Sequence, residues 1–119
     1  MSERIVTGKA HDLEAQVFDS DTVRGVEKRI LIGEKHNAPN FVMRLFTVKP
    51  GGYSPRHSHD WEHEVFIVKG EATVVTPEGE IKVSAGSYVY VPKNVEHQFK
   101  NETEDILEFI CVVPVYAEK

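Results

Sequence analysis

Hydrophobic and polar positions alternate in short runs along most of the chain, and no window shows the 3.6-residue spacing of an amphipathic helix. The runs end at Gly, Pro, Asn or charged residues, as β-strands commonly do. They predict strands at about 28–32, 41–49, 65–68, 72–76, 80–83, 87–91, 96–99 and 106–113, with a possible short strand at 15–18. Short strands at close, even spacing favour an antiparallel all-β sandwich or barrel of the jelly-roll kind.

The run from residue 41 to 49 is apolar on both of its alternating faces. One face carries Phe41, Met43 and Leu45, and the other carries Val42, Phe46 and Val48. A strand of this kind is covered on both sides, whereas the outer face of a small barrel otherwise meets water. We therefore predict a homodimer. Arg44 interrupts the run, and its side chain could either reach inward to hold an anionic group of a substrate or extend to solvent.

A length of 119 residues fits one domain that can bury a core without cross-links. We expect a single domain over 1–119, with the barrel core at about 41–113 and N-terminal strands at about 1–40. The formal net charge of -5 disfavours nucleic acid as a partner. Lys28 and Arg29 form no long basic run, so we interpret them as part of a solvated face.

The cysteine content and the apolar runs indicate where the protein works. Cys111 is the one cysteine, so no intramolecular disulfide can form. There is no apolar signal-peptide region after the charged start, and the chain is therefore predicted to be cytoplasmic. The longest apolar run, from Phe109 to Ala117, is interrupted by Pro114 and has about half the length that spans a bilayer. We expect no membrane partner.

Histidine is the residue type with the clearest chemical pattern. Three of the six histidines, His57, His59 and His63, lie within seven residues. In an extended strand, residues two apart point to the same side roughly 6 to 7 Å apart, so His57 and His59 could bind one metal ion. His63 follows after a turn, and His97 lies in a segment that reads as strand, turn and strand. These four histidines are the predicted metal ligands, while His11 and His36 lack partners and read as ordinary exposed histidines.

Glycines, prolines and an asparagine surround these histidines at spacings that match two known motifs. The first motif, Gly, five residues, His-x-His, three or four residues, Glu, six residues and Gly, is matched by Gly51, His57, His59, His63 and Gly70. The second, Gly, five residues, Pro-x-Gly, two residues, His, three residues and Asn, is matched by Gly86, Pro92, His97 and Asn101. His63 stands in the place of the usual glutamate, beside Glu64, and Asn94 replaces the central glycine. The pattern resembles the cupin superfamily, in particular small single-domain cupins of the cupin_2 type.

The resemblance extends to the four-histidine manganese-binding cupins of thermophilic bacteria. It implies a double-stranded β-helix that is usually dimeric, with one divalent transition metal per subunit. Manganese is favoured by the resemblance, while imidazole ligands also suit iron, nickel, copper and zinc. Four histidines on a six-coordinate ion would leave two open positions, whereas the same four on tetrahedral zinc would close the site.

Residues on the same strand faces as the histidines are candidates for the pocket wall. Phe99 stands two residues after His97, and Phe109, Cys111 and Val113 share one face of the last strand. With Arg44, these residues line a pocket if that face is the barrel interior, although core packing explains the phenylalanines equally well. Cys111 is more often an inert buried thiol than a reactive one. Trp61 could cap the pocket mouth or, as we slightly prefer, pack at a subunit interface.

Cupins with this motif pair include dioxygenases, isomerases and decarboxylases, so the fold alone does not give the reaction. The predicted lining holds few acids or bases, which favours a metal-dependent oxidoreductase of the dioxygenase type. Its substrate would be a small, partly apolar or aromatic molecule. The alternatives are a non-catalytic small-molecule-binding or sensor protein, an isomerase, and a closed metal site that only stabilises the barrel. No individual catalytic residue is identified.

Overall fold

The computed structural model describes residues 4–118. Residues 1–3, at the start of the predicted N-terminal segment, and residue 119 lie outside this range. Nine strands and three short 3-10 helices follow one another along the described chain. They are η1 (Ala10–Asp12), β1 (Gln16–Phe18), β2 (Arg24–Ile32), η2 (Glu34–His36), β3 (Phe41–Tyr53), β4 (His63–Lys69), β5 (Glu71–Thr76), β6 (Gly79–Ser84), β7 (Tyr88–Val91), β8 (Gln98–Lys100), β9 (Leu107–Pro114) and η3 (Val115–Glu118).

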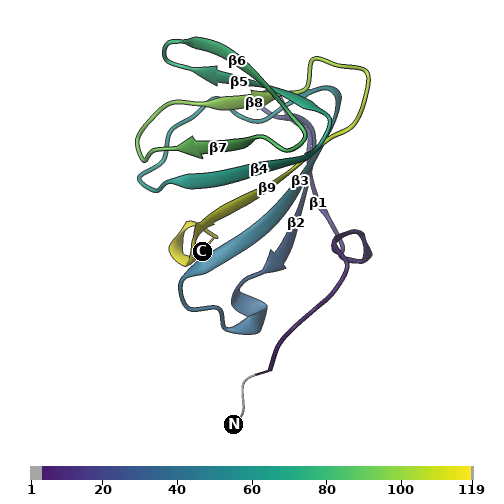
Figure 1. Ribbon diagram of the computed structural model, residues 1–119, viewed down its shortest axis with the longest axis vertical. Helices are drawn as coiled ribbons and strands as arrows, with labels where there is room; N and C mark the ends of the chain where they lie inside the picture. Colours follow the sequence, from purple (N-terminus) through teal and green to yellow (C-terminus); the bar gives the residue numbers. More distant parts are fainter. Residues whose placement is uncertain (1–3, 119) are drawn as a thin grey trace.

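The strands form one antiparallel sheet that curls into a half-barrel (Figure 1). Its order is β6-β5-β8-β3-β9-β4-β7, with β2 also paired to β3 and β1 paired to β2. Strand β3 is central to this arrangement, since it pairs with β2, β8 and β9. The predicted all-β, jelly-roll type of fold is confirmed.

Most predicted strands lie close to the expected places, but several differ in extent. The strand expected at 41–49 continues through residues 50–52 to Tyr53. The strand expected at 28–32 begins earlier, at Arg24, because Arg24 and Val26 pair with the far end of β3. The strand expected at 96–99 begins later, at Gln98. His97 instead forms an isolated bridge with His57, in which the two backbone N–H groups donate to the opposite carbonyls at 3.1 and 2.9 Å.

Alternation along β9 shows how the sequence builds the interior. Leu107, Phe109, Cys111 and Val113 point inward and are at most 4% exposed, while the residues between them are partly exposed. Inward residues of β3, β4 and β5 complete the core, as the two-residue period of a strand requires. The core thus consists mainly of aliphatic side chains, with Phe99 and Phe109 at its border with the cavity described below.

The outer face of β3 is covered in part by the chain's own N-terminal segment. Arg29 donates from Nε to the Leu13 carbonyl at 3.0 Å. His11, expected to lack a partner, lies 2.8 Å from Glu108, which also accepts a hydrogen bond from Thr47 of β3. On the same face, Leu45 is 5% exposed, whereas Phe41 is 66% exposed. The homodimer stays a prediction. Among residues 4–118, no helix is long and apolar enough to cross a membrane.

Candidate metal centre

Backbone pairing brings together histidines that come from separate parts of the chain. His57 and His59 lie between β3 and β4, His63 opens β4, and His97 immediately precedes β8. The bridge between His57 and His97 fixes two of these segments side by side. Asn94 adopts the left-handed conformation, with φ of 65°, and its N–H donates to the His59 carbonyl. An asparagine tolerates this conformation, which accounts for its presence where the motif has glycine.

Three imidazoles converge on one point. Ligand atoms of His57, His59 and His97 all lie within 4.8 Å of one another, and the Nε2 atoms of His57 and His59 are 3.1 Å apart. The Nδ1 of His97 lies 2.9 Å from the Val95 carbonyl, which can only accept a hydrogen bond. Nδ1 of His97 therefore carries the proton, and its Nε2 presents a lone pair, as in a metal ligand fixed by a backbone carbonyl.

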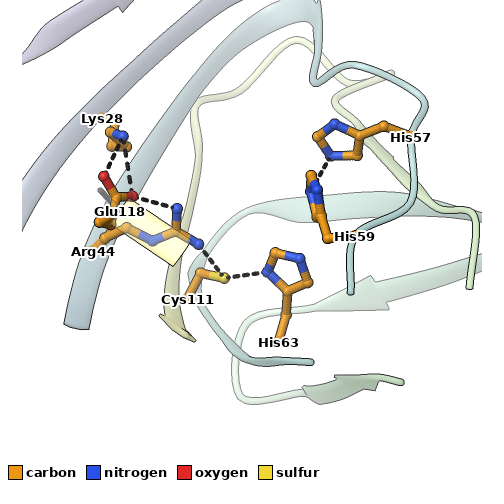
Figure 2. Close-up of polar contacts among 7 residues, drawn as sticks. All are labelled: Lys28, Arg44, His57, His59, His63, Cys111 and Glu118. Carbon is orange, nitrogen blue, oxygen red and sulfur yellow. Dashed lines mark hydrogen bonds and ion pairs between the residues drawn. The ribbon is translucent and has the colours of Figure 1, made fainter. Parts of the chain in front are cut away.

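His63, the fourth predicted ligand, lies beside this triad. Its ring centroid is 5.0 Å from that of His97 and 5.2 Å from that of His59. Its Nδ1 lies 3.2 Å from Cys111 Sγ, and its Nε2 is buried without a hydrogen-bond partner (Figure 2). A buried polar atom without a partner is costly, and a metal ion at the triad would give this nitrogen one. The role of His63 as a ligand stays a prediction.

The surroundings favour the neutral form of His57, His59 and His63 by lowering the pKa of each. Burial, followed by the neighbouring histidines, lowers the pKa of His57 to about 4 and that of His63 to about 3. Burial is also the main cause that lowers the pKa of His59, although Asp60 partly opposes it. Imidazole binds a metal in its neutral form. The cluster is thus ready to bind a cation at neutral pH, and its chemistry fits a divalent transition metal.

A cavity of about 190 Å³ opens onto the histidines. The sequence-derived pocket residues Arg44, Phe99, Phe109 and Cys111 all line it, whereas Val113 lies in the core. The remaining lining residues are Phe18, Val23, Val26, Lys28, Phe46, Val48, Ser54, Pro55, His57, His59, His63 and His97. Most of this wall is apolar, which suits a small ligand with an apolar part.

Stacked aromatic rings form one side of the cavity. The ring of Phe109 stacks between Phe99, at 4.9 Å, and Phe46, at 5.3 Å. Phe99 also meets His97 edge to face, with the centroids 6.4 Å apart. Phe99 and Phe109 thus border both the core and the cavity. The two roles considered for them, core packing and pocket wall, are therefore the same surface.

A chain of polar contacts forms another side of the cavity (Figure 2). Lys28 donates to both Glu118 oxygens at 3.0 and 3.1 Å, and Arg44 donates from Nη1 to Glu118 Oε2 at 2.7 Å. Arg44 also donates from Nη2 to Cys111 Sγ at 3.0 Å, so its side chain reaches inward rather than to solvent. The interpretation of Lys28 and Arg29 as part of a solvated face is wrong, because each of the two side chains is only 14% exposed.

The charge states along this chain follow from its contacts. Burial opposes ionisation of Glu118, but hydrogen bonds from Lys28 and Arg44 outweigh it and hold the pKa below the usual range of a carboxyl. Burial raises the pKa of the Cys111 thiol, although the neighbouring Arg44 guanidinium acts in the opposite direction. Glu118 is therefore an anion at neutral pH, and Cys111 is a neutral thiol.

Trp61 packs against the histidine cluster. Its ring stacks on His59 with the centroids 4.5 Å apart and an interplanar angle of 5°, and it meets Tyr116 edge to face at 6.0 Å. Trp61 thus lies beside the histidines but is not among the residues that line the cavity, so both the pocket-mouth and the interface role stay predictions. Tyr116 belongs to η3, so the helix that carries Glu118 also contacts the segment between β3 and β4 that carries His57 and His59.

Sequence reasoning did not find Lys28 and Glu118 as site residues. Their contact joins positions 90 residues apart, and it depends on the turn of η3 after β9. Neither residue stands in a motif or at a distinctive spacing. The one sequence signal near Glu118 is the end of the strand pattern at Pro114, after which the chain turns into η3.

Comparison with known proteins places the chain in a family. The model of the cupin domain (Cupin_2) matches residues 44–113, more than half of the chain. The chain belongs to the cupin family. The matched range contains all four candidate histidines together with Arg44 and Cys111, whereas Lys28 and Glu118 lie outside it.

Similar proteins carry diverse names. A 1-methylthio-D-xylulose 5-phosphate methylsulfurylase from Rhodospirillum rubrum is 29% identical over 96 residues, which make up 81% of this chain and 60% of that protein. The solved structure of the polyketide cyclase RemF from Streptomyces resistomycificus superposes with a TM-score of 0.87 at 26% identity, covering 94% of this cupin and 80% of RemF.

A second structure, of a predicted oxalate decarboxylase from Thermotoga maritima, has a TM-score of 0.80 at 19% identity, covering 92% of this chain and 99% of that one. The likeness at this identity shows the fold. Together these names leave the specific activity of the present cupin open.

Proposed function

We propose that this cupin is a metal-dependent enzyme that acts on a small, partly apolar molecule in the cavity. The observation that carries the proposal is the convergence of three imidazoles, His57, His59 and His97, at a largely apolar cavity. A cavity with an apolar wall and a few convergent polar groups is the usual form of a small-molecule site.

The proposed cofactor is one divalent transition metal per subunit, with manganese favoured. His57, His59 and His97 would hold it, and His63 would supply its unpartnered Nε2 as a fourth ligand. When bound, such an ion polarises a substrate group or activates a bound water. Because the four ligands are neutral, they leave the positive charge of the ion uncompensated, which favours binding of an electron-rich or anionic group.

Residues of the chain would orient the substrate and exclude water. The rings of Phe46, Phe99 and Phe109 give an apolar platform. Cys111, held by Arg44, contacts His63 Nδ1 and thereby fixes the orientation of that imidazole. Such contacts behind a metal ligand preserve its geometry.

The leading reaction class is oxidative chemistry of the dioxygenase type on an aromatic or partly apolar molecule, which the aromatic wall supports. A second candidate is a non-oxidative reaction such as an isomerisation. The contact chain through Lys28, Glu118, Arg44 and Cys111 favours it, because it places polar groups at the cavity where the sequence predicted few. A non-catalytic binding or sensor role is the remaining alternative.

Metal exchange separates these candidates. Protein loaded with manganese, iron or zinc is assayed against a panel of small aromatic acids and sugar phosphates, with oxygen uptake and product formation recorded separately. Oxidative chemistry predicts turnover with manganese or iron, accompanied by oxygen uptake, and none with redox-inert zinc. Turnover with zinc and without oxygen uptake would assign the non-oxidative reaction. Failure to retain any transition metal after loading would refute the proposed function.

The proposed setting is a single cytoplasmic cupin domain that forms a homodimer. Exposed apolar residues on β4 and β7 offer a surface for a second copy; they are Phe66, Val68, Tyr88 and Tyr90. Elution at the mass of a 13.5 kDa monomer in size-exclusion chromatography would contradict the dimer.

A further inference from the structure

The cavity has an imbalance of charge. Two cationic side chains, Lys28 and Arg44, line it, and no carboxylate is among its lining residues within the described range 4–118. Both cations are largely removed from water, with side chains 14% and 10% exposed. Buried cations need an anionic partner, because the loss of hydration is otherwise uncompensated. What balances them is therefore informative about the ligand.

A single carboxylate, that of Glu118, serves both cations. It accepts hydrogen bonds from Lys28 at 3.0 and 3.1 Å and from Arg44 at 2.7 Å. One negative charge faces two positive charges, and Arg44 Nε, which is buried, still has no hydrogen-bond partner. The site thus holds more donors and more positive charge than Glu118 can satisfy. A larger or more highly charged oxyanion would satisfy it better.

The helix that supplies Glu118 is short and only partly buried. η3 has four residues, Val115–Glu118, and none of them is buried. Its other contacts include a backbone hydrogen bond from Val115 to Asn40 at 2.9 Å and the edge-to-face packing of Tyr116 on Trp61. Val115 and Ala117 also pack, partly buried, against the edge of the core. Segments with little buried apolar surface open at low free-energy cost. Glu118 could therefore leave Lys28 and Arg44 without unfolding the barrel.

We propose that Lys28 and Arg44 form a subsite for an oxyanion group of the substrate, a carboxylate or a phosphate, and that Glu118 occupies this subsite until the substrate displaces it. The inference rests on the proposed function and narrows its substrate to an acidic small molecule. The apolar body of that molecule lies along Phe46 and Phe109, and its far end faces the histidines.

The test compares anion binding to the full-length protein and its Glu118→Gln variant by titration calorimetry. Benzoate and phenyl phosphate are the probes, and benzyl alcohol is the uncharged counterpart. If Glu118 competes for the subsite, its neutralisation tightens anion binding by about tenfold, since apparent affinity scales with the fraction of open sites. Benzyl alcohol shows no such gain. A preference for one of the two anions identifies whether the natural group is a carboxylate or a phosphate.

Lys28→Gln removes one donor of the subsite and should weaken binding of either anion by about tenfold, the worth of a hydrogen bond to a charged group. Its matched control is Lys100→Gln, which removes a lysine of the same kind from an ion pair with Glu80 and Glu102 away from the cavity. That control should bind like the wild type. Glu118→Ala serves as a second variant, and the thermal melt of each variant verifies its fold.

Two results would overturn the inference. Glu118 would be a permanent structural partner if neither Glu118→Gln nor Glu118→Ala bound the anions more tightly than the wild type. The subsite would lie elsewhere if Lys28→Gln bound them unchanged. All titrations are made with metal-loaded and with metal-free protein, while retention of metal is measured separately. If the Lys28 and Glu118 variants change anion affinity as expected but the protein retains no metal, the proposed metal enzyme is refuted and the anion subsite is supported.

Discussion

The two polar sides of the cavity are built in different ways. The histidine side consists of His57, His59, His63 and His97, which come from two compact motifs, and burial lowers the pKa of His57, His59 and His63. The cationic side consists of Lys28 and Arg44, joined by Glu118, and it stays fully charged. One side suits a metal and the other suits an anion, so a ligand that spans both would be an acidic molecule oriented toward the metal.

The difference also separates what each side contributes to the molecule. Neutral imidazoles with unused lone pairs add little to the fold and are available for binding. The paired charges tie β2, β3 and η3 together and contribute to stability as well as recognition. Substitutions on the histidine side should therefore act on metal affinity, and those at Arg44 mainly on stability.

The largest expected effect is the loss of metal from His57→Ala. Removing one of three convergent ligands should lower metal affinity by roughly 100-fold or more, since even residues behind a ligand commonly cost 10- to 100-fold. Titration calorimetry with manganese and elemental analysis after dialysis measure the loss. Because His57 is only half buried, the melting temperature of the metal-free variant should stay close to that of the metal-free wild type.

The matched control is His36→Ala, which removes an equally half-buried histidine from η2, outside the cluster. It should retain the wild-type metal content. Equal metal affinity of His57→Ala and His36→Ala would show that the triad is not the metal site.

How far each side could be predicted follows from the same difference. The histidines and the pocket residues Phe99, Phe109 and Cys111 could be placed because strand alternation and local spacing fix which side chains share a face. The all-β fold followed from the strand-length pattern. The pairing of Lys28 with Glu118 could not be predicted, because it depends on the register of β2 on β3 and on a turn after Pro114.

The covering of β3 shows a second limit of the sequence. Its doubly apolar pattern indicated that both faces are covered, but a pattern does not identify what covers them. Leu45 of this strand is 5% exposed, whereas Phe41 of the same face is 66% exposed, so the cover does not extend to its first residue. Sequence alternation thus predicts burial more securely than it predicts the neighbour.

An intermediate effect is expected from Arg44→Met, which removes the guanidinium and keeps an apolar stem beside Phe46. Breaking a buried ion pair is strongly destabilising, but Lys28 would remain with Glu118, so we expect a loss of about 2 kcal/mol. For a domain of this size, the melting temperature should fall by about 8 °C. Differential scanning calorimetry measures the shift, and manganese affinity should change far less than in His57→Ala.

Arg56→Met is the control for that substitution, because the Arg56 and Glu96 side chains of its ion pair are 55% and 51% exposed. Exposed pairs contribute little, so a change below about 0.5 kcal/mol is expected. If both arginine variants melted at the wild-type temperature, the cationic side would have no structural role.

The smallest expected effect is a pH dependence that acts on the histidine side alone. In metal-free protein the pKa values of His57 and His63 are about 4 and about 3, below the 6.5 of an unfolded histidine. As pH falls below 6.5, the unfolded state takes up protons first, so stability is complete above pH 6.5 and decreases toward pH 4. Because His57 is only half buried, water screens part of its effect. We therefore expect a loss of about 1 kcal/mol between pH 7 and 5, or about 4 °C in melting temperature.

The contribution of Glu118 to stability is lost at a lower pH than that of the histidines. Its pKa is already below the usual 4.5, so its contribution is retained above that pH and is lost only on stronger acidification.

Metal-free His63→Gln should therefore show a weaker dependence of melting temperature between pH 7 and 5 than the wild type, with His36→Gln as the matched control. If His63→Gln and the wild type lost stability in parallel over this range, the imidazole of His63 would not be held neutral by the fold, and the contrast between the two sides would rest on metal affinity alone.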